Sequence, residues 1–353
     1  LNIKKGDLKK TESKEGDGTL TLSGPNEYTG TTTISDGAIE ILAADGISKN
    51  TIYMDGGKLI VNGDTEVELI NEIMGTDKND VNIEITGEDT TMTGKIFGNA
   101  NLVKTGAGLL DLQMESKSYA GDTMISNGTV KGTTKNINGK VIGSGDANTT
   151  VEFYDADGEV TLNEFDVDKY VGTFNKTGLS TMTVTNNFKA ANANITAGIF
   201  IINNDASMGG SGSTFEVTNQ MSVENALLKG YGDIKTGDLI IRNGATLAPG
   251  CSTTTFKVDG NLIFEDGGTY DVEFGQVDMT KAGHYNDNTT VTGTTTIGED
   301  SKITLNNLKG KYYVRETIEL INSGTLADGY EYKEENVIFI SRSEERRVGK
   351  ECR

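Results

Sequence analysis

The chain has 353 residues, a formal net charge of −20, two prolines and no tryptophan. Nucleic acids and anionic lipid surfaces attract lysine- and arginine-rich proteins and repel acidic ones, so neither is expected as a partner of this chain. Apolar side chains make up 35% of the residues and glycine adds another 45 residues, so each stretch of chain has little apolar bulk with which to build a core.

The first residue, Leu1, is followed by nothing with the basic, apolar and small-residue order of a signal peptide. We therefore expect the sequence to begin inside a longer protein. No apolar run approaches the ~18 residues that would span a bilayer, so we expect no direct membrane insertion of this chain.

A degenerate repeat appears three times in the first two thirds of the chain. Each copy opens with a lysine and a glycine-containing turn, and an isoleucine follows 20, 21 or 19 residues later, ahead of a second turn. The lysine and isoleucine pairs are Lys14 and Ile34, Lys104 and Ile125, and Lys176 and Ile195. The near-constant offset predicts that the copies fold alike.

Between the copies, four to six residues alternate apolar and polar and are separated by Asn-Gly, Asp-Gly or Gly-Gly, as in Val81–Ile85. This pattern predicts short strands and tight turns. Repeats of ~20 to 25 residues favour an all-β solenoid, a right-handed parallel β-helix of ~15 coils stacked at ~4.8 Å. Threonine suits its outer face, and Leu20, Leu110 and Met182 should point inward at comparable positions. An antiparallel sandwich or a β-propeller is the structural alternative.

Residues Asp155, Asp157 and Glu164 have oxygen-ligand spacing around Gly158, as in part of an EF-hand loop. The first ligand position is Phe153, which cannot coordinate a cation. An Asp-Gly turn between two strands is therefore the favoured interpretation, and weak calcium binding stays open. No other metal site and no cofactor is expected.

Large apolar residues become more frequent from Leu239 to Ile340. Because burial free energy scales with apolar area, we expect the C-terminal third to be the most stable part and to act as a folding scaffold. Limited proteolysis in urea should then leave a core that begins near residue 230.

The last twelve residues, Arg342 to Arg353, differ sharply from the rest. They hold four arginines, whereas residues 1–341 hold only Arg242 and Arg315. The stretch resembles a translated sequencing adapter along its whole length, so we expect it to contribute nothing to the fold. Without it the formal charge would be −22, and Cys251 would be the one remaining thiol.

Catalytic signals are weak. His284 is the sole histidine and lies in a polar stretch. The sequence contains no serine-nucleophile motif with which this histidine could form a Ser-His-Asp triad, so we expect no catalytic site. A β-helical carbohydrate-active enzyme is retained as an alternative, since the 49 acidic residues before the tail could stack paired carboxylates across coils.

Two sets of motifs resemble a known family. Lys104–Leu112 followed by Tyr119–Val130 is similar to the passenger-associated repeat of bacterial autotransporters, and Gly18–Ile39 resembles it more closely still. Stretches similar to the segment that precedes the membrane barrel of such proteins are Arg242–Gly250, Val258–Phe264, Gly268–Phe274 and Val291–Ile297. Cys251 departs from the pattern at a position where a small polar residue is expected.

The resemblance implies a right-handed β-helical passenger, exported through both membranes of a Gram-negative bacterium with help from a C-terminal β-barrel of its own, which we expect to be missing from this fragment. Residues 1–240 would be passenger repeats, 241–341 the pre-barrel segment and 342–353 the artefact. The implied role is that of a non-enzymatic stalk or adhesin, at the cell surface or secreted, with host-surface or glycan ligands as candidates. An adhesin exported by a separate partner pore is a further alternative.

Overall fold

The computed structural model describes residues 12–76, 79–114, 119–145, 147–208, 210–250, 255–274, 286–307, 320–327 and 337–341. Cys251, His284 and the adapter-like stretch Arg342–Arg353 lie outside these ranges. The chain divides into two compact units: unit 1 holds residues 1–155 and 163–175, and unit 2 holds residues 156–162 and 176–353. The predicted boundary at residue 240 stays a prediction.

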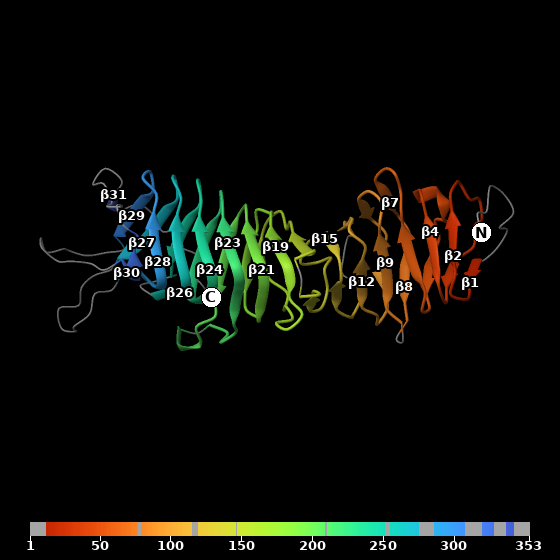
Figure 1. Cartoon of the computed structure of the whole chain (residues 1–353), viewed down its shortest axis with the longest axis horizontal. Helices are drawn as coiled ribbons and strands as arrows, with labels where there is room; N and C mark the ends of the chain where they lie inside the picture. Colours follow the sequence, from red (N-terminus) through yellow and green to blue (C-terminus); the bar gives the residue numbers. More distant parts are fainter. Residues whose placement is uncertain are drawn as a thin grey trace, which may run out of the picture. The chain divides into compact units, whose positions relative to one another are not determined.

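Each unit consists of short strands stacked in parallel, coil upon coil (Figure 1). The chain is therefore an all-β parallel β-solenoid, as predicted, and the antiparallel alternative is wrong. Right-handedness remains a prediction. The regular helices of the described residues are two single-turn 3-10 helices, η1 (Ala44–Gly46) and η2 (Ala206–Met208), and no described helix has the length and hydropathy needed to cross a bilayer.

Unit 1 has three parallel sheets. Its first sheet contains β1 (Glu12–Lys14), β3 (Thr32–Ile34), β5 (Ile52–Met54), β8 (Ile73–Gly75) and β11 (Ile96–Phe97). Its second sheet contains β2 (Thr19–Leu22), β4 (Ala38–Ile41), β6 (Lys58–Val61), β9 (Val81–Ile85), β12 (Leu102–Thr105), β14 (Thr123–Ile125) and β16 (Val141–Ile142). Its third sheet contains β7 (Val67–Leu69), β10 (Thr90–Met92), β13 (Leu109–Leu112), β15 (Gly128–Gly132), β17 (Thr149–Phe153) and β19 (Val171–Lys176).

Unit 2 has two long ladders, and the bent strand β24 (Leu227–Ile241) takes part in both. One ladder also contains β18 (Glu159–Thr161), β20 (Thr181–Val184), β22 (Ile199–Asn203), β25 (Thr246–Pro249), β27 (Thr269–Phe274), β29 (Lys302–Asn307) and β31 (Val337–Ser341). The other also contains β21 (Phe188–Ile195), β23 (Phe215–Val223), β26 (Thr255–Phe264), β28 (Asn288–Ile297) and β30 (Ile321–Leu326).

Alternate residues of each strand point into a narrow core, as the period-two pattern predicts. Leu110 and Met182 are fully buried, which confirms their inward placement. Leu20 is only half-buried, because β2 is an edge strand of its sheet. Among the described strands it pairs with β4 on one side and with none on the other.

The first two repeat copies do not occupy the same faces of the solenoid. In the first copy β1 and β3 lie in the first sheet and β2 and β4 in the second, whereas in the second copy β12 and β14 lie in the second sheet and β13 and β15 in the third. Leu20 and Leu110 therefore belong to different sheets. The repeat encodes a strand, turn and strand that can sit on either pair of adjacent faces.

Buried aromatic rings are distributed unevenly. Among the described residues before Phe153, the buried aromatic side chains are Tyr28 and Tyr119. From Phe153 onward they are frequent: Phe153, Phe165, Phe174, Phe188, Phe200, Phe215, Phe256, Phe264 and Tyr270. The increase in apolar bulk thus begins well before Leu239, where the composition alone had placed it.

A column of glycines marks the bend in the second ladder of unit 2. Gly237, Gly260, Gly293 and Gly324 lie where the strand register shifts. A Cβ atom added to any of them would approach a carbonyl oxygen of the preceding coil to 2.6 Å or less, and to 1.8 Å for Gly260. Only glycine allows adjacent coils to approach so closely at this bulge.

Candidate functional site

The lysine that opens the second and third copies of the repeat is a buried structural group. Lys104 and Lys176 are both fully buried. The Nζ atom of Lys104 donates to the carbonyl oxygens of Thr105, Gly106 and Asn127 at 2.8, 2.7 and 3.2 Å. The first two acceptors belong to its own turn and the third to the turn one coil later, so the ammonium group ties two turns together.

The third copy makes the same arrangement. Lys176 Nζ donates to the carbonyl oxygens of Gly178, in its own turn, and Ala197, one coil later, at 2.6 and 2.7 Å. These bonds satisfy carbonyl groups at the corners of the coils that would otherwise be buried without a hydrogen-bond partner. Lys104 and Lys176 are therefore part of the core and are not available to a ligand.

The stability of unit 1 should depend on pH through Lys104. Burial lowers the pKa of its ammonium group from 10.5 to about 8, and the nearby Glu84 opposes the shift. Below pH 8 the desolvation cost of the charge is fully present. Between the folded and unfolded pKa values the folded protein releases a proton that the unfolded chain still holds, so stability rises with pH.

We expect the free energy of unfolding of the wild type, relative to that of Lys104→Met, to increase by ~2 kcal/mol between about pH 7.5 and pH 10. Urea titrations of both proteins at several pH values measure this difference. Lys95→Met, which replaces an exposed lysine of the same unit, is the control and should not reproduce this pH-dependent difference. A flat or falling difference for Lys104→Met would exclude the predicted shift.

A buried tyrosine and threonine recur in the matching coils of the first two copies. Tyr28 and Tyr119 lie 2.6 and 2.7 Å from the hydroxyl groups of Thr32 and Thr123. In the second copy the tyrosine hydroxyl also accepts a hydrogen bond from the backbone N–H of Asn138 at 2.9 Å. These recurring residues of the repeat thus contribute to packing, and threonine is used inside the solenoid as well as outside.

The residues proposed to bind calcium have other partners. Asp155 is buried, and its carboxylate accepts hydrogen bonds from the backbone N–H and the hydroxyl group of Thr134 at 2.8 to 3.1 Å. Glu164 forms an ion pair with Lys140 at 3.2 Å. Asp157 is exposed and precedes Gly158, which has a φ of 77°, so the predicted Asp-Gly turn is confirmed.

Weak calcium binding by these residues stays open. A bound ion would have to compete with Thr134 for the carboxylate of Asp155 and with Lys140 for that of Glu164. Within the described ranges, no group of three or more His, Cys, Asp or Glu side chains is arranged to hold a metal ion. His284 lies outside those ranges.

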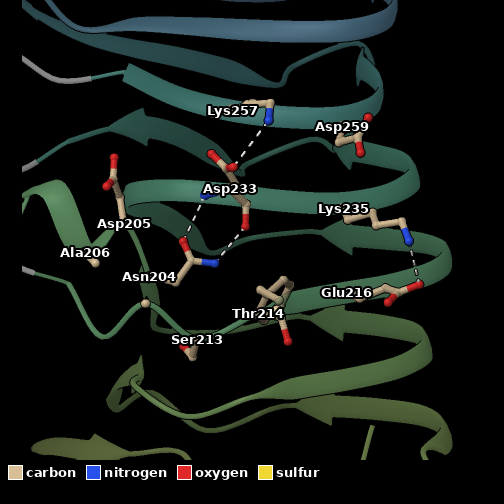
Figure 2. A pocket seen from close by; sticks show the side chains of 12 residues that line it. Asn204, Asp205, Ala206, Ser213, Thr214, Glu216, Asp233, Lys235, Lys257 and Asp259 are labelled. Atoms are coloured by element: carbon tan, nitrogen blue, oxygen red, sulfur yellow. Dashed lines mark hydrogen bonds and ion pairs between the residues drawn. The ribbon is translucent and has the colours of Figure 1, made fainter. Parts of the chain in front are cut away.

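The best candidate for a ligand site is a pocket of about 590 Å³ in unit 2 (Figure 2). One wall is formed by Asn204–Ala206 and Gly212–Thr214, which come from the segment between β22 and β23. The floor consists of side chains on three successive coils, from β23, β24 and β26: Glu216, Asp233, Lys235, Lys257 and Asp259.

A clamp between Asn204 and β24 holds the wall in place. The Asn204 side chain donates to the carbonyl oxygen of Asp233 and accepts from its backbone N–H, both at 2.9 Å. The neighbouring Gly232 has a φ of 132°, and a Cβ atom there would lie 1.8 Å from Asn204 Oδ1. The clamp therefore requires glycine at this position.

Acidic and basic side chains alternate along the floor. Glu216 pairs in register with Lys235, and Asp233 with Lys257, and each lysine lies 3.3 Å from its carboxylate partner. Asp259 accepts a hydrogen bond from the Thr292 hydroxyl group at 2.9 Å. The floor thus offers cationic donors and anionic acceptors spaced by the ~4.8 Å distance between coils.

No sequence motif predicts this pocket. Two features of the sequence could have indicated it. One is the glycine- and serine-rich stretch 206–214, and the other is the pairing of an aspartate with a lysine two residues away, at positions 233 and 235 and at 257 and 259. A second hollow of about 520 Å³ lies over Glu224, Arg242, Glu265 and Asp266. Its one basic side chain is surrounded by carboxylates, with Arg242 Nε 3.8 Å from Glu265.

Comparisons with known proteins match parts of the chain. The family model described as the passenger-associated-transport-repeat matches residues 13–41 and 102–131. Over 115 residues the chain is 32% identical to the protein named "Adhesin BmaC autotransporter" of Brucella suis biovar 1 (strain 1330). That stretch is 32% of this chain and 3% of the Brucella protein, and no solved structure matches significantly.

Proposed function

We propose that this autotransporter passenger segment, a parallel β-solenoid with passenger-associated transport repeats, is a non-enzymatic attachment element displayed on the surface of a Gram-negative bacterium. Its relative in Brucella is named an adhesin, and we transfer that role to this chain. Export would use a translocator domain of the same polypeptide, a C-terminal β-barrel, because the relative is named an autotransporter and not one half of a two-partner system.

One observation carries the proposal. The residues that recur in the matched repeats, such as Lys104, Tyr119 and Gly128, are buried and form hydrogen bonds to the following coil. The repeat therefore maintains the solenoid, and the polar outward side chains remain for contact with other molecules. This is the division of labour expected of a stalk or adhesin, in which scaffold and binding surface are made by alternate residues of the same strands.

We further propose that the C-terminal part of the chain assists folding and outer-membrane export. A solenoid is stabilised by contacts between neighbouring coils, so a stable end can template the coils that follow without an energy source at the outer membrane. The buried aromatic rings from Phe153 to Tyr270 support a stable C-terminal part.

Attachment is tested with latex beads that carry the purified full chain and are incubated with cultured epithelial cells. We expect more beads to bind than albumin-coated beads, and expect binding to be lost with the poorly folded variant Phe215→Ala. Binding equal to that of albumin would contradict the attachment role. A glycosidase activity that one carboxylate substitution abolishes would contradict the non-enzymatic assignment.

A further inference from the structure

The pocket of unit 2 is lined mainly by polar and charged side chains. At about 590 Å³ its volume lies in the range of ligand sites, but such sites are usually lined by apolar and aromatic side chains. Here the one aromatic lining residue, Phe215, is 2% exposed and belongs to the core. Apart from Phe215, the apolar side chain of the lining is Ala206, and the other lining residues are polar, charged or glycine, so the pocket favours a ligand that forms many hydrogen bonds.

Exposed donors and acceptors lie side by side on the floor. The side chains of Lys235, Asp233 and Lys257 are 64%, 62% and 45% exposed, so each has capacity beyond its ion pair. Neighbouring sugar hydroxyl groups donate and accept in turn, which matches the alternation of ammonium and carboxylate groups on successive coils. In Figure 2 Asp233 lies beside Asn204, to which its backbone is hydrogen-bonded, and Lys235 and Lys257 lie farther from Asn204.

The charges select against acidic ligands. The pocket is lined by four carboxylates, those of Asp205, Glu216, Asp233 and Asp259, and by two lysines, and the whole chain carries −20. A polyanionic glycan would be repelled at long range, while a strongly cationic peptide would meet Lys235 and Lys257 at the floor. An uncharged, hydroxyl-rich ligand avoids both costs.

We propose that this pocket binds a short neutral oligosaccharide, and that it supplies the ligand contact for the attachment role on which this inference rests. The ligand lies across β23, β24 and β26, its hydroxyl groups accepting hydrogen bonds from Lys235 and Lys257 and donating to Asp233 and Asp259. The clamp between Asn204 and β24 fixes the wall, so little of the binding free energy is spent on ordering the site.

The experiment is titration calorimetry of the full chain with four probes: maltotriose, N,N′-diacetylchitobiose and N-acetyllactosamine as neutral glycans, and 3′-sialyllactose as an acidic one. We expect at least one neutral glycan to bind. If N-acetyllactosamine is the neutral glycan that binds, its affinity should exceed that of 3′-sialyllactose by about tenfold or more. A lysine-rich peptide is included, and binding of the peptide alone would overturn the proposal.

Variants locate the site. Lys235→Gln should lower the affinity for that glycan by about fivefold or more and leave the Tm unchanged. Lys58→Gln, which removes a lysine from an outward ion pair of unit 1, is the matched control and should have no effect. Equal losses in both variants, or equal binding of acidic and neutral glycans, would contradict the assignment.

If no neutral glycan binds while coated beads still attach to cells, the inference fails and the attachment role stands. If the beads also fail to attach, both fail.

Discussion

Replacing Gly260 with alanine is expected to lower the free energy of unfolding by about 3 kcal/mol or more. Its φ is 152°, a conformation that L side chains rarely adopt, and the new Cβ atom would lie 1.8 Å from the carbonyl oxygen of Thr236. That oxygen is backbone of the adjacent coil, so relief requires β24 and β26 to separate. Urea denaturation followed by circular dichroism measures the loss.

Gly158→Ala is the matched control. Gly158 also belongs to unit 2 and has a positive φ of 77°, but no atom lies within 4 Å of the position of its Cβ. The control should lose only the ~1 kcal/mol of backbone strain. Equal losses in the two variants would show that close approach of the coils does not explain the glycine column.

Phe215→Ala should cost ~3–5 kcal/mol of stability. The Phe215 ring is stacked on that of Phe188, with centroids 4.5 Å apart and planes at 9°, and meets the ring of Phe200 edge-on at 6.0 Å. All three side chains are buried, so removing the central ring leaves a cavity and ends both aromatic contacts. The same urea titrations measure the effect.

An exposed apolar residue of the same unit provides the comparison. Leu179 is 73% exposed in the turn that follows Lys176, so Leu179→Ala should change stability by less than ~0.5 kcal/mol. A Phe215→Ala variant that is no less stable than Leu179→Ala would mean that the ring stack does not carry the stability of this region.

The fold class could be predicted because its causes are local. Alternation such as Val81–Ile85 determines which side chains face inward, and glycines with positive φ, such as Gly37 and Gly128 at 59° and 73°, mark the corners. A repeated spacing of corners and strands suffices to predict stacked coils. The face that a repeat occupies depends on the number of residues in the coils before it, so the displacement of the second copy could not be read from either copy alone.

The roles of polar residues were harder to predict. A lysine is almost never fully buried without partners, and the partners of Lys104 include the carbonyl group of Asn127, which only the next coil brings within 3.2 Å. The assignment of threonine to the outer face was incomplete for a similar reason, because Thr32 and Thr123 are buried against tyrosines.

The pocket was missed because its floor joins side chains from three successive coils, and no single strand contains enough of it to form a motif. Glu216, Lys235 and Asp259 become neighbours only through the register of β23, β24 and β26. The calcium candidates show the opposite case: a local spacing suggested a site, but it does not reveal Thr134 and Lys140, which contact two of the carboxylates.

Limited proteolysis of the full chain in moderate urea, with the fragments identified by mass, is the most direct test of the claim that the C-terminal part of the solenoid is its stable scaffold. Because the buried aromatic rings increase from Phe153 onward, we expect a protected fragment that begins between Phe153 and Phe188, earlier than the residue-230 start suggested by composition, and that retains Phe215. Protection confined to residues before Phe153 would contradict the claim.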